Sequence, residues 1–554
     1  MKDFKKSVFY QIYPKSFKDS NGDGFGDIKG VTTSLGYLKD LGVDYIWLTP
    51  FYISPQKDNG YDVEDYKSID KRFGTMEDFE ELVAESKKLD IDIMLDMVFN
   101  HTSTEHQWFK NALNGDEKYK DYYIFKAPVD GKEPTNWISK FGGNTWEYVE
   151  KFDEYYLHLF DKTQADLNWE NEAVREEIYD VVNYWVKKGV KGFRLDVINL
   201  ISKPEEFIND YEGDGRRFYT DGPKIHEYLK ELNSNSFGKN KDLITVGEMS
   251  STSIENCVRY SNPQEQELDM VFNFHHLKVD YKNGEKWTLM DFDFMKLKNL
   301  LNEWQIGMEK GWNALFWCNH DQPRIVSRFG DDKNYPKESA KMLATTLHLL
   351  RGTPYIYQGE EIGMTNAYFD NIEEYRDIES INYYNILKSE GKSEKEIIKI
   401  LQAKSRDNSR TPMQWSSEKN SGFTEGTPWI PLSKSTDITV ESSLRDEDSV
   451  YYHYKKLISL RKEHDIIAYG NYRPILEENL KIFGYIRSYE NKELIVLNNF
   501  YGETIDVDVD VDVKEFVDEY KKLDILISNY KDSTKDLKNI KLRPYESIAY
   551  IIEK

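Results

Sequence analysis

Four carboxylates stand in or directly after short apolar runs of this 554-residue chain: Asp96 in LDMVFNH, Asp196 in GFRLDV, Glu248 in VGEM and Asp321 in NHD. Carboxylates gathered in a low-dielectric interior cost several kcal/mol unless they find partners. Core packing does not explain that cost, whereas catalysis does. Glycoside hydrolysis needs one carboxylate that attacks the anomeric carbon and one carboxyl that protonates the leaving oxygen. A third can stabilise the positively charged transition state.

Basic side chains beside these carboxylates fit the same chemistry. Arg194 stands two residues before Asp196, so both side chains point to the same face of a strand. A guanidinium there favours the ionised form that a nucleophile requires. His101 and His320 stand at predicted strand ends beside carboxylates. We therefore interpret them as hydrogen-bond donors to sugar hydroxyls rather than as ordinary core histidines.

Eight apolar, β-branched or aromatic runs alternate with amphipathic stretches that are typical of helices. The runs cover residues 8–14, 43–50, 91–100, 190–197, 243–248, 268–274, 314–321 and 354–359. Such alternation indicates parallel βαβ units, and eight units close into a (β/α)8 TIM barrel of the α/β class. Active sites of these barrels lie at the carboxyl ends of the strands. Asp196, Glu248 and Asp321 are expected there, after strands four, five and seven.

Two stretches depart from the barrel pattern. Residues 102–170 form a long segment containing Trp and Gly after the third run, which predicts an inserted subdomain. From residue 472 the pattern changes to short alternating strands, which predicts a C-terminal antiparallel β domain over 472–554. The barrel then takes residues 1–101 and 171–471. Alternating Asp and Val over 506–513 predicts a half-buried strand rather than a metal site.

Composition limits the partners and the compartment. The net charge is −24, and such an acidic surface repels nucleic acid and anionic membranes, so we expect neither as a partner. Cys257 and Cys318 are too few for a disulfide framework. The N-terminus lacks the apolar region of a signal peptide, and no stretch approaches the roughly 20 apolar residues of a membrane span. We expect a cytoplasmic monomer.

The motifs together resemble the α-amylase family of glycoside hydrolases. Those that match are, in order, DMVFNH (96–101), QADLNW (164–169), GFRLDV (192–197), GEMSS (247–251) and NHDQPR (319–324). The resemblance implies that Asp196 is the nucleophile, Glu248 the acid/base and Asp321 the transition-state stabiliser, without an organic or redox cofactor. It also implies that Asp62 in NGYDV and Arg406 in RDNSRTPMQW bind the terminal glucose. Their pairing would close the pocket and favour exo-action.

Within the family, the chain is similar to the branch of oligo-1,6-glucosidases and trehalose-6-phosphate hydrolases. This character is carried by YQIYPKSFKDSNGDGFGD, HTSTEHQWF, LFWCNHDQPR and PYIYQGEEIGMTN. Val197, directly after the nucleophile, resembles the residue in members that cleave α-1,6 or α,α-1,1 bonds. The segment PRIVSRFGDD lacks the charged loop of sucrose isomerases. A non-catalytic transporter partner would have lost the three carboxylates, which this chain keeps.

Residues 272–287 decide between two substrates. The segment follows the sixth run, so it belongs to the active-site rim, and Lys278, Lys282 and Lys286 recur there at four-residue spacing. The spacing alone fits solvated lysines as well as an anion site. The resemblance favours an anion, because oligo-1,6-glucosidases carry an acidic residue in place of Lys278 and Glu in place of His275. It implies a sugar phosphate, trehalose 6-phosphate, held by Lys278 and Lys286. Isomaltose-type oligosaccharides are the alternative.

A loop after the first run predicts a structural calcium ion. The candidate ligands are the side chains of Asp19, Asn21, Asp23 and Asp27 and the carbonyl oxygen of Phe25. They alternate oxygen atoms as a hard cation requires, and the loop resembles the calcium loop of the family. Gly30 stands where an EF-hand has its bidentate Glu, so the loop is not an EF-hand. An Asx-rich turn without metal is the alternative.

Overall fold

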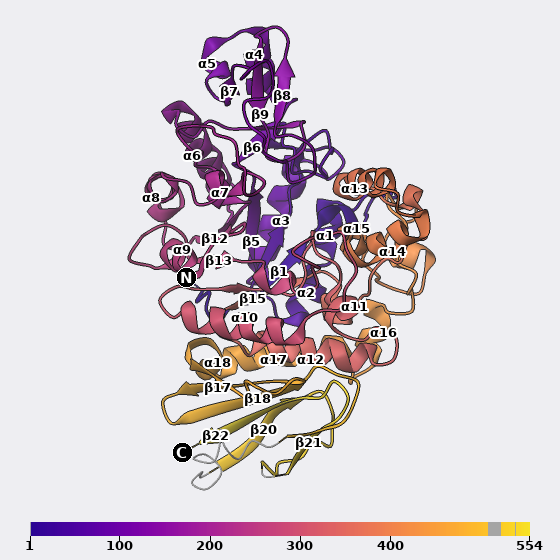
Figure 1. Ribbon diagram of the computed structural model, residues 1–554. Helices are drawn as coiled ribbons and strands as arrows, with labels where there is room; N and C mark the ends of the chain where they lie inside the picture. Colours follow the sequence, from indigo (N-terminus) through magenta and orange to yellow (C-terminus); the bar gives the residue numbers. More distant parts are fainter. Residues whose placement is uncertain (1, 508–521, 538, 554) are drawn as a thin grey trace.

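The computed structural model of the protein describes residues 2–507, 522–537 and 539–553. Its centre is one sheet of eight parallel strands (Figure 1). In sheet order the strands are β13 (Met270–Phe272), β12 (Ile244–Glu248), β11 (Gly192–Leu195), β5 (Asp92–Met97), β2 (Tyr45–Leu48), β1 (Phe9–Ile12), β15 (Thr353–Tyr357) and β14 (Ala314–Leu315). A parallel bridge between Val271 and Asn313 joins the two ends of this order. Each predicted run overlaps one of these strands, so the predicted TIM barrel is confirmed.

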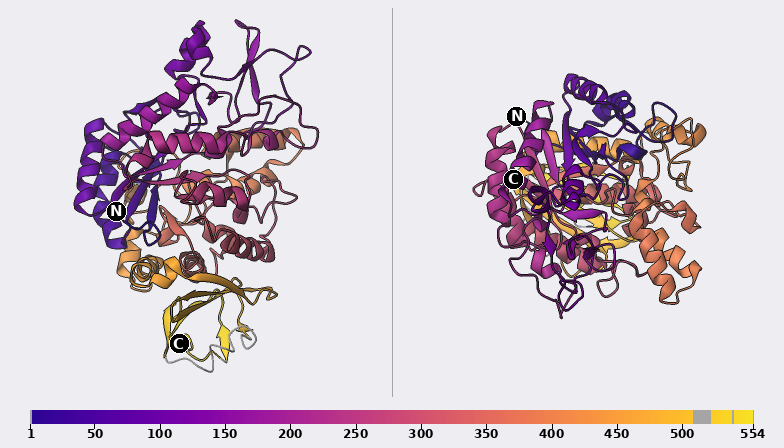
Figure 2. Two further views of the ribbon diagram at one scale, coloured as in Figure 1. Left: turned by 90° about the vertical axis from the view of Figure 1, so that its left-hand side faces the viewer. Right: turned by 90° about the horizontal axis from the view of Figure 1, so that it is seen from above.

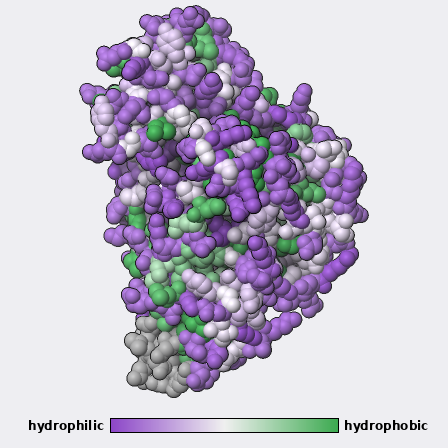
Figure 3. Space-filling view, turned by 45° about the vertical axis from the view of Figure 1, so that its right-hand side comes forward, coloured by the Kyte–Doolittle hydropathy of each residue, from purple (hydrophilic) through white to green (hydrophobic). Residues whose placement is uncertain are grey.

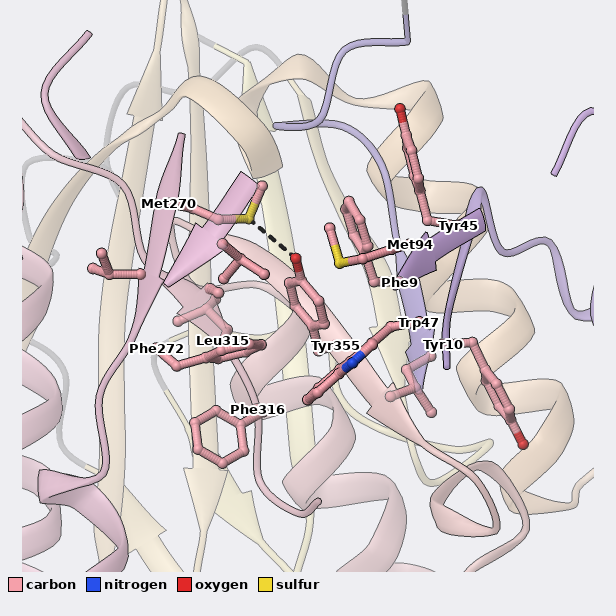
Figure 4. Close-up of a cluster of buried hydrophobic side chains, with 14 of the residues drawn as sticks. Phe9, Tyr10, Tyr45, Trp47, Met94, Met270, Phe272, Leu315, Phe316 and Tyr355 are labelled. Atoms are coloured by element: carbon pink, nitrogen blue, oxygen red, sulfur yellow. Dashed lines mark hydrogen bonds between the residues drawn. The ribbon is translucent and has the colours of Figure 1, made fainter. Parts of the chain in front are cut away.

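Aromatic side chains fill the barrel interior. Phe9 stacks against Tyr45 and Tyr355, with ring centroids 4.4 and 4.5 Å away (Figure 4). The Tyr355 hydroxyl lies 3.4 Å from the sulfur of Met270 on β13, which is two strands away from β15 around the closed barrel. Trp47 stands edge-on to Tyr355. Large rings that interlock in this way bury much apolar surface, so the barrel gives the residues at its strand ends a rigid floor.

Helices follow the strands and cover the barrel. They are α1 (Ile28–Thr33), α2 (Leu35–Leu41), α3 (Met76–Lys88), α6 (Glu172–Lys187), α7 (Arg216–Tyr219), α8 (Ile225–Asn235), α9 (Ile254–Ser261), α10 (Phe294–Gly307), α11 (Ile325–Phe329) and α12 (Pro336–His348). In α3 the local sequence explains both ends. Thr75 and Asp78 form a capping box at the start, and Lys87 and Lys88 lie in the last turn, where cations complement the helix dipole.

The stretch between β5 and α6 forms the inserted subdomain, which projects from one end of the barrel (Figure 1). Its base is an antiparallel pair of β6 (His101–Ser103) and β10 (Gln164–Asp166). Beyond this pair lie α4 (Gln107–Asn114), α5 (Glu117–Lys120) and a three-stranded antiparallel sheet of β7 (Phe125–Lys126), β9 (Glu154–Leu157) and β8 (Trp146–Val149). Because β6 follows β5 closely, the subdomain sits on the carboxyl ends of the barrel strands.

The chain makes a second excursion after β15. Its helices are α13 (Ile378–Ser389), α14 (Glu394–Lys404), α15 (Asp407–Arg410), α16 (Val440–Arg445), α17 (Val450–Glu463) and α18 (Asp465–Tyr469). The segment has its own small apolar core, in which Phe369, Tyr375, Ile397 and Leu401 pack together. This core fixes α15 and so holds the motif RDNSR against the barrel.

The C-terminal part is an antiparallel sheet at the end of the molecule opposite the inserted subdomain (Figures 1 and 2). Its strands are β16 (Asn471–Ile475), β17 (Ile482–Tyr489), β18 (Lys492–Asn499), β22 (Ser547–Glu553) and β20 (Lys522–Ser528); β19 (Ile505–Val507) pairs separately with β21 (Ile540–Leu542). In β18, Leu494 and Val496 face the barrel core, whereas Ile495 and Leu497 face a second core. Beyond Val507, the strand predicted over 506–513 lies outside the described residues.

Polar residues cover most of the face of the molecule drawn in Figure 3. Within the described residues, no helix is both long and apolar enough to cross a membrane. Cys257 and Cys318 are both buried and free, in agreement with the expectation that they form no disulfide.

Glu360 gives a stability prediction. It begins the 3₁₀ helix η5 (Glu360–Ile362) after β15, and its Oε1 accepts a hydrogen bond of 2.9 Å from the Tyr454 hydroxyl of α17. Burial raises the pKa of Glu360 from 4.5 to about 8. The neutral acid therefore stabilises the fold below pH 4.5, and this contribution is lost as the pH rises through 8. Glu360→Gln removes the titration, so we expect its Tm relative to wild type to increase between pH 5.5 and 8.5.

Calorimetric scans at both pH values would measure this difference. Glu447→Gln, at an exposed position, is the control and should follow wild type at both. A Glu360→Gln curve parallel to wild type would show that Glu360 titrates alike in the folded and unfolded chain.

Candidate active site

The three predicted catalytic carboxylates line one cavity of about 260 Å³ at the carboxyl ends of the barrel strands. Asp196 directly follows β11, and Glu248 is the last residue of β12. Asp321 was expected at the end of strand seven. However, β14 ends at Leu315, and Asp321 lies further along, in the loop that follows. Loop geometry, rather than the barrel strand, therefore sets the position of the third carboxylate.

Arg194 binds three carboxylates at once. Its Nη1 donates to Asp96 at 2.7 Å and to Asp196 at 2.5 Å, and its Nη2 donates to Glu248. The guanidinium is fully buried and lies over the ring of Trp47, 5.1 Å from its centroid. The arrangement bears out the expectation that Arg194 and Asp196 share a face. It also shows that the same cation holds Glu248 and Asp96.

One guanidinium cannot neutralise three carboxylates. Burial raises the pKa of Asp196 well above its ordinary value; the Arg194 charge opposes this shift, and the charges of Glu248 and Asp96 add to it. Burial likewise raises the pKa of Asp96 to about 6. Like charges this close cannot all ionise cheaply, so the cluster as a whole retains a proton. Such a shared proton is what a general acid beside a carboxylate nucleophile needs.

The turn that presents Asp196 is strained. Val197 adopts φ 35° and ψ 39°, a left-handed conformation that is rare for a β-branched residue. Its backbone N–H donates to Oε2 of Glu248 at 3.1 Å. The strained residue thus ties the loop after β11 to the end of β12, and strain of this kind concentrates at functional sites.

Asp321 is held by cations of the excursion after β15. Arg410 donates to its Oδ1 at 2.5 Å, and Arg406 lies 3.3 Å from the same atom. Although burial favours the protonated form, the charges of Arg406 and Arg410 hold the pKa of Asp321 well below its usual range. Asp321 is therefore a permanent anion, which suits stabilisation of a positively charged transition state.

The two predicted histidines differ in what they can offer a ligand. Nδ1 of His320 lies 2.8 Å from the side-chain amide nitrogen of Gln11 and so accepts from it, which places the ring proton on Nε2. That Nε2 is buried without a hydrogen-bond partner, near Asp321 at 3.4 Å. His101 lines the cavity, but its Nε2 already donates to the Tyr61 carbonyl at 3.1 Å. Burial lowers both histidine pKa values, to about 3 and 4, so both rings stay neutral.

The expected pairing of Asp62 with Arg406 is wrong. Asp62 does not line the cavity; its carboxylate accepts from Ser54 and from the backbone N–H groups of Lys57 and Asp58. It is Asp58, four residues earlier, that reaches Nη2 of Arg406 at 3.0 Å. The buried Asp62 folds the loop, and the loop presents Asp58. Both belong to KDNGYD, so the sequence marked the right loop but not the right carboxylate.

Lysines occupy the rim, but the surroundings of Lys278, Lys282 and Lys286 differ. Lys278 lines the cavity, and within the described residues its ammonium has no ion-pair or hydrogen-bond partner. Lys286 also lines the cavity, but Glu379 binds its ammonium at 2.6 Å. Lys282 is exposed. A further lysine of the cavity wall, Lys140, comes from the inserted subdomain, where no sequence pattern singled it out.

The predicted calcium loop is closed by its own hydrogen bonds. Asp19 accepts from the backbone of Asn21, Gly22 and Gly24, and Asp27 caps α1. Within the part of the chain that the structure describes, no group of three or more acidic, His or Cys side chains is arranged to hold a metal ion. These hydrogen bonds are those of an Asx-rich turn, and a bound calcium ion stays a prediction.

A TIM barrel with three carboxylates in one pocket fits the chemistry of a glycoside hydrolase, and comparisons with known proteins agree. Residues 11–470 match the catalytic domain of α-amylases, and residues 482–549 match the C-terminal domain of the α-amylase SusG. This chain belongs to the α-amylase family and is a glycoside hydrolase.

Individual relatives extend over the whole chain. A trehalose-6-phosphate hydrolase of Bacillus subtilis is 56% identical, over 100% of this chain and 98% of the relative. An oligo-1,6-glucosidase of Bacillus cereus is 48% identical over 99% of both. A crystal structure of a point variant of the Bacillus licheniformis trehalose-6-phosphate hydrolase is 58% identical and matches with a TM-score of 0.97 over the full length of both chains.

The finding that Asp58, and not Asp62, pairs with Arg406 gives a testable prediction. Asp58→Asn should lower kcat/KM for an α-glucoside by about a hundredfold with little change in Tm, because a charge-assisted contact in the pocket is lost. Asp62→Asn should chiefly lower Tm, because a buried carboxylate loses hydrogen bonds that fold the loop. Steady-state kinetics and thermal unfolding of both variants test this. The reverse pattern would restore Asp62 as the ligand.

Proposed function

We propose that this protein is a retaining α-glucosidase that hydrolyses α,α-trehalose 6-phosphate to glucose and glucose 6-phosphate. The observation that carries the proposal is an unpaired ammonium, that of Lys278, in the cavity that also holds Asp196 and Glu248. A neutral disaccharide has no use for such a charge, whereas a phosphate monoester carries nearly two negative charges at pH 7. The full-length likeness to trehalose-6-phosphate hydrolases supports the same substrate.

In the first step, Asp196 attacks the anomeric carbon of the unphosphorylated glucose, and Glu248 protonates the departing oxygen of glucose 6-phosphate. The glycosidic C–O bond breaks as the bond to Asp196 forms. The proton comes from the set that the carboxylates around Arg194 share. Arg194 stabilises the negative charge on Asp196 before attack, and Asp321 stabilises the positive charge that develops on the sugar ring.

In the second step, Glu248 acts as a base. It takes a proton from a water molecule, and the oxygen of that water attacks the anomeric carbon and displaces Asp196. Two inversions give net retention, so the glucose is released as the α-anomer. No organic or redox cofactor takes part in either step.

The glucose end of the cavity is closed by ion pairs. Arg406 bridges Asp58 and Asp377 and lies over the ring of Phe141 at 5.0 Å. A longer glucan chain cannot pass such a wall, so we assign exo-action on a terminal, unphosphorylated glucose. His320, with its unpaired Nε2, donates to a hydroxyl of this sugar.

The rival substrate is an isomaltose-type oligosaccharide, because an oligo-1,6-glucosidase also aligns over nearly the whole chain. It would use the same carboxylates and would differ only at the rim. Lys286 does not separate the two, since Glu379 already neutralises it. Lys278 does, because its charge is free for an anion.

The test compares kcat/KM for trehalose 6-phosphate, trehalose and isomaltose by glucose release, with Asp196→Asn as the inactive control. We expect a preference for trehalose 6-phosphate over trehalose of at least a hundredfold, equivalent to about 2.7 kcal/mol. NMR of the first product should show α-glucose. If isomaltose is the best substrate and phosphate confers no advantage, the proposal is wrong and the retaining mechanism alone survives.

Calcium in the loop over 19–27 stays a prediction. A bound ion predicts that dialysis against EDTA lowers the Tm and that added Ca2+ restores it. The hydrogen bonds that close the loop predict instead that the Tm does not change. Thermal unfolding with and without EDTA decides between the two.

We place the protein in the cytoplasm as a monomer. Two buried, unpaired cysteines suit a reducing compartment, and a charged sugar phosphate does not cross membranes unaided. Cell fractionation and light scattering of the purified protein test these two assignments.

A further inference from the structure

We propose that Lys140, from the inserted subdomain, binds the phosphate of the leaving sugar together with Lys278, and that Arg216 adds a third positive charge. The inference rests on the proposed function and assigns its phosphate subsite. It also removes Lys286 from that subsite.

The three cations come from three separate segments of the chain. Lys140 lies in the inserted subdomain between β7 and β8, Arg216 begins α7 after β11, and Lys278 follows β13. Lys140 and Lys278 both line the cavity. Arg216 lies close enough that its charge lowers the pKa of both lysines. Residues so distant in sequence gather only because the subdomain is placed on the barrel.

Lys140 and Lys278 differ from other half-buried cations of the protein, such as Lys286, which is paired with a carboxylate. Lys140 and Lys278 have no ion-pair partner within the described residues, and the Lys140 ammonium lies 5.5 Å from the centroid of the Tyr219 ring. Arg216 is paired with Asp214, and this carboxylate offsets only one of the three positive charges. Half-buried like charges without counterions repel one another, so the arrangement is costly unless an anion joins it.

The cavity is therefore divided by charge. Around the glucose site lie the carboxylates Asp58, Asp196, Glu248 and Asp321, which would repel a phosphate. Lys140 and Lys278 lie on the wall of the same cavity, and Arg216 is close enough to act on the pKa of both. A substrate with one neutral and one phosphorylated glucose fits this division in a single orientation. The phosphorylated sugar then stands on the leaving side of the bond that breaks.

The proposed phosphate subsite is tested by measuring the activity of lysine variants on two substrates, one with a phosphate and one without. Trehalose 6-phosphate uses both ends of the cavity, whereas p-nitrophenyl α-glucoside carries no phosphate. We expect Lys140→Ala and Lys278→Ala each to lower kcat/KM for trehalose 6-phosphate roughly tenfold or more, chiefly through KM. Turnover of the aryl glucoside should change less than about twofold. Inhibition by glucose 6-phosphate should weaken in both variants.

Matched controls are available on the same segments. Lys132→Ala in the inserted subdomain and Lys282→Ala in the loop after β13 each remove an exposed lysine. Both should behave as wild type with both substrates. Equal losses on the two substrates in Lys140→Ala would indicate a structural role and overturn the inference, as would an unchanged KM for trehalose 6-phosphate. If wild type shows no preference for the phosphorylated substrate, it is the proposed function that fails.

A pH series adds a second readout. Burial, with the charges of Arg216 and Lys278, lowers the pKa of Lys140 to about 7, while Asp214 opposes the shift. Between pH 7 and 9 the phosphate stays a dianion, but Lys140 loses its proton. We expect the preference for trehalose 6-phosphate over the aryl glucoside to fall across this range in wild type. In Lys140→Arg, whose charge persists, the preference should stay level. If the preference changed with pH equally in wild type and in Lys140→Arg, Lys140 would not be a phosphate ligand.

Discussion

The active site depends on one unequal division of charge, in which three buried carboxylates share the guanidinium of Arg194. A single cation lowers the cost of burying the three carboxylates, but it cannot keep all three of them ionised. In the proposed mechanism, the group donates its proton in the first step, and the charge of Arg194 opposes the protonation of Asp196 that burial favours. With a second cation in this place the cluster would be more stable and less able to act as an acid.

The rest of the barrel serves to keep this cluster rigid. Oδ2 of Asp96 accepts hydrogen bonds from Trp47 at 3.2 Å and from the Tyr61 hydroxyl at 2.9 Å, and Oδ1 accepts from Arg194, so both oxygens are fixed. Trp47 is in turn wedged among the rings that fill the barrel (Figure 4). Asp321 belongs to a separate system, with Arg406 and Arg410 from the excursion after β15. The pocket thus joins two electrostatic units with opposite tasks, one that retains a proton and one that stays ionised.

The sequence predicted those site residues whose positions follow from the repeating βαβ units of the barrel. Eight alternating runs placed Asp196 and Glu248, because strand ends of a barrel must meet at one face. The prediction from sequence failed where only tertiary contacts distinguish between residues of the same type in one segment. Asp58 and Asp62 share one loop, and only the fold shows which carboxylate turns inward. The spacing of the rim lysines could not show that Glu379 neutralises one of them.

Lys140 could not be predicted from any pattern along the sequence. It lies in no repeat and no motif, and its neighbours in space are distant in the chain. What distinguishes it is the absence of a counterion within the described residues, in a protein with net charge −24 where carboxylates are plentiful. Lys286, on the same cavity wall, has found one. In so acidic a protein, a half-buried lysine pair with no ion-pair partner within the described residues is better explained by the charge of a ligand than by that of the fold.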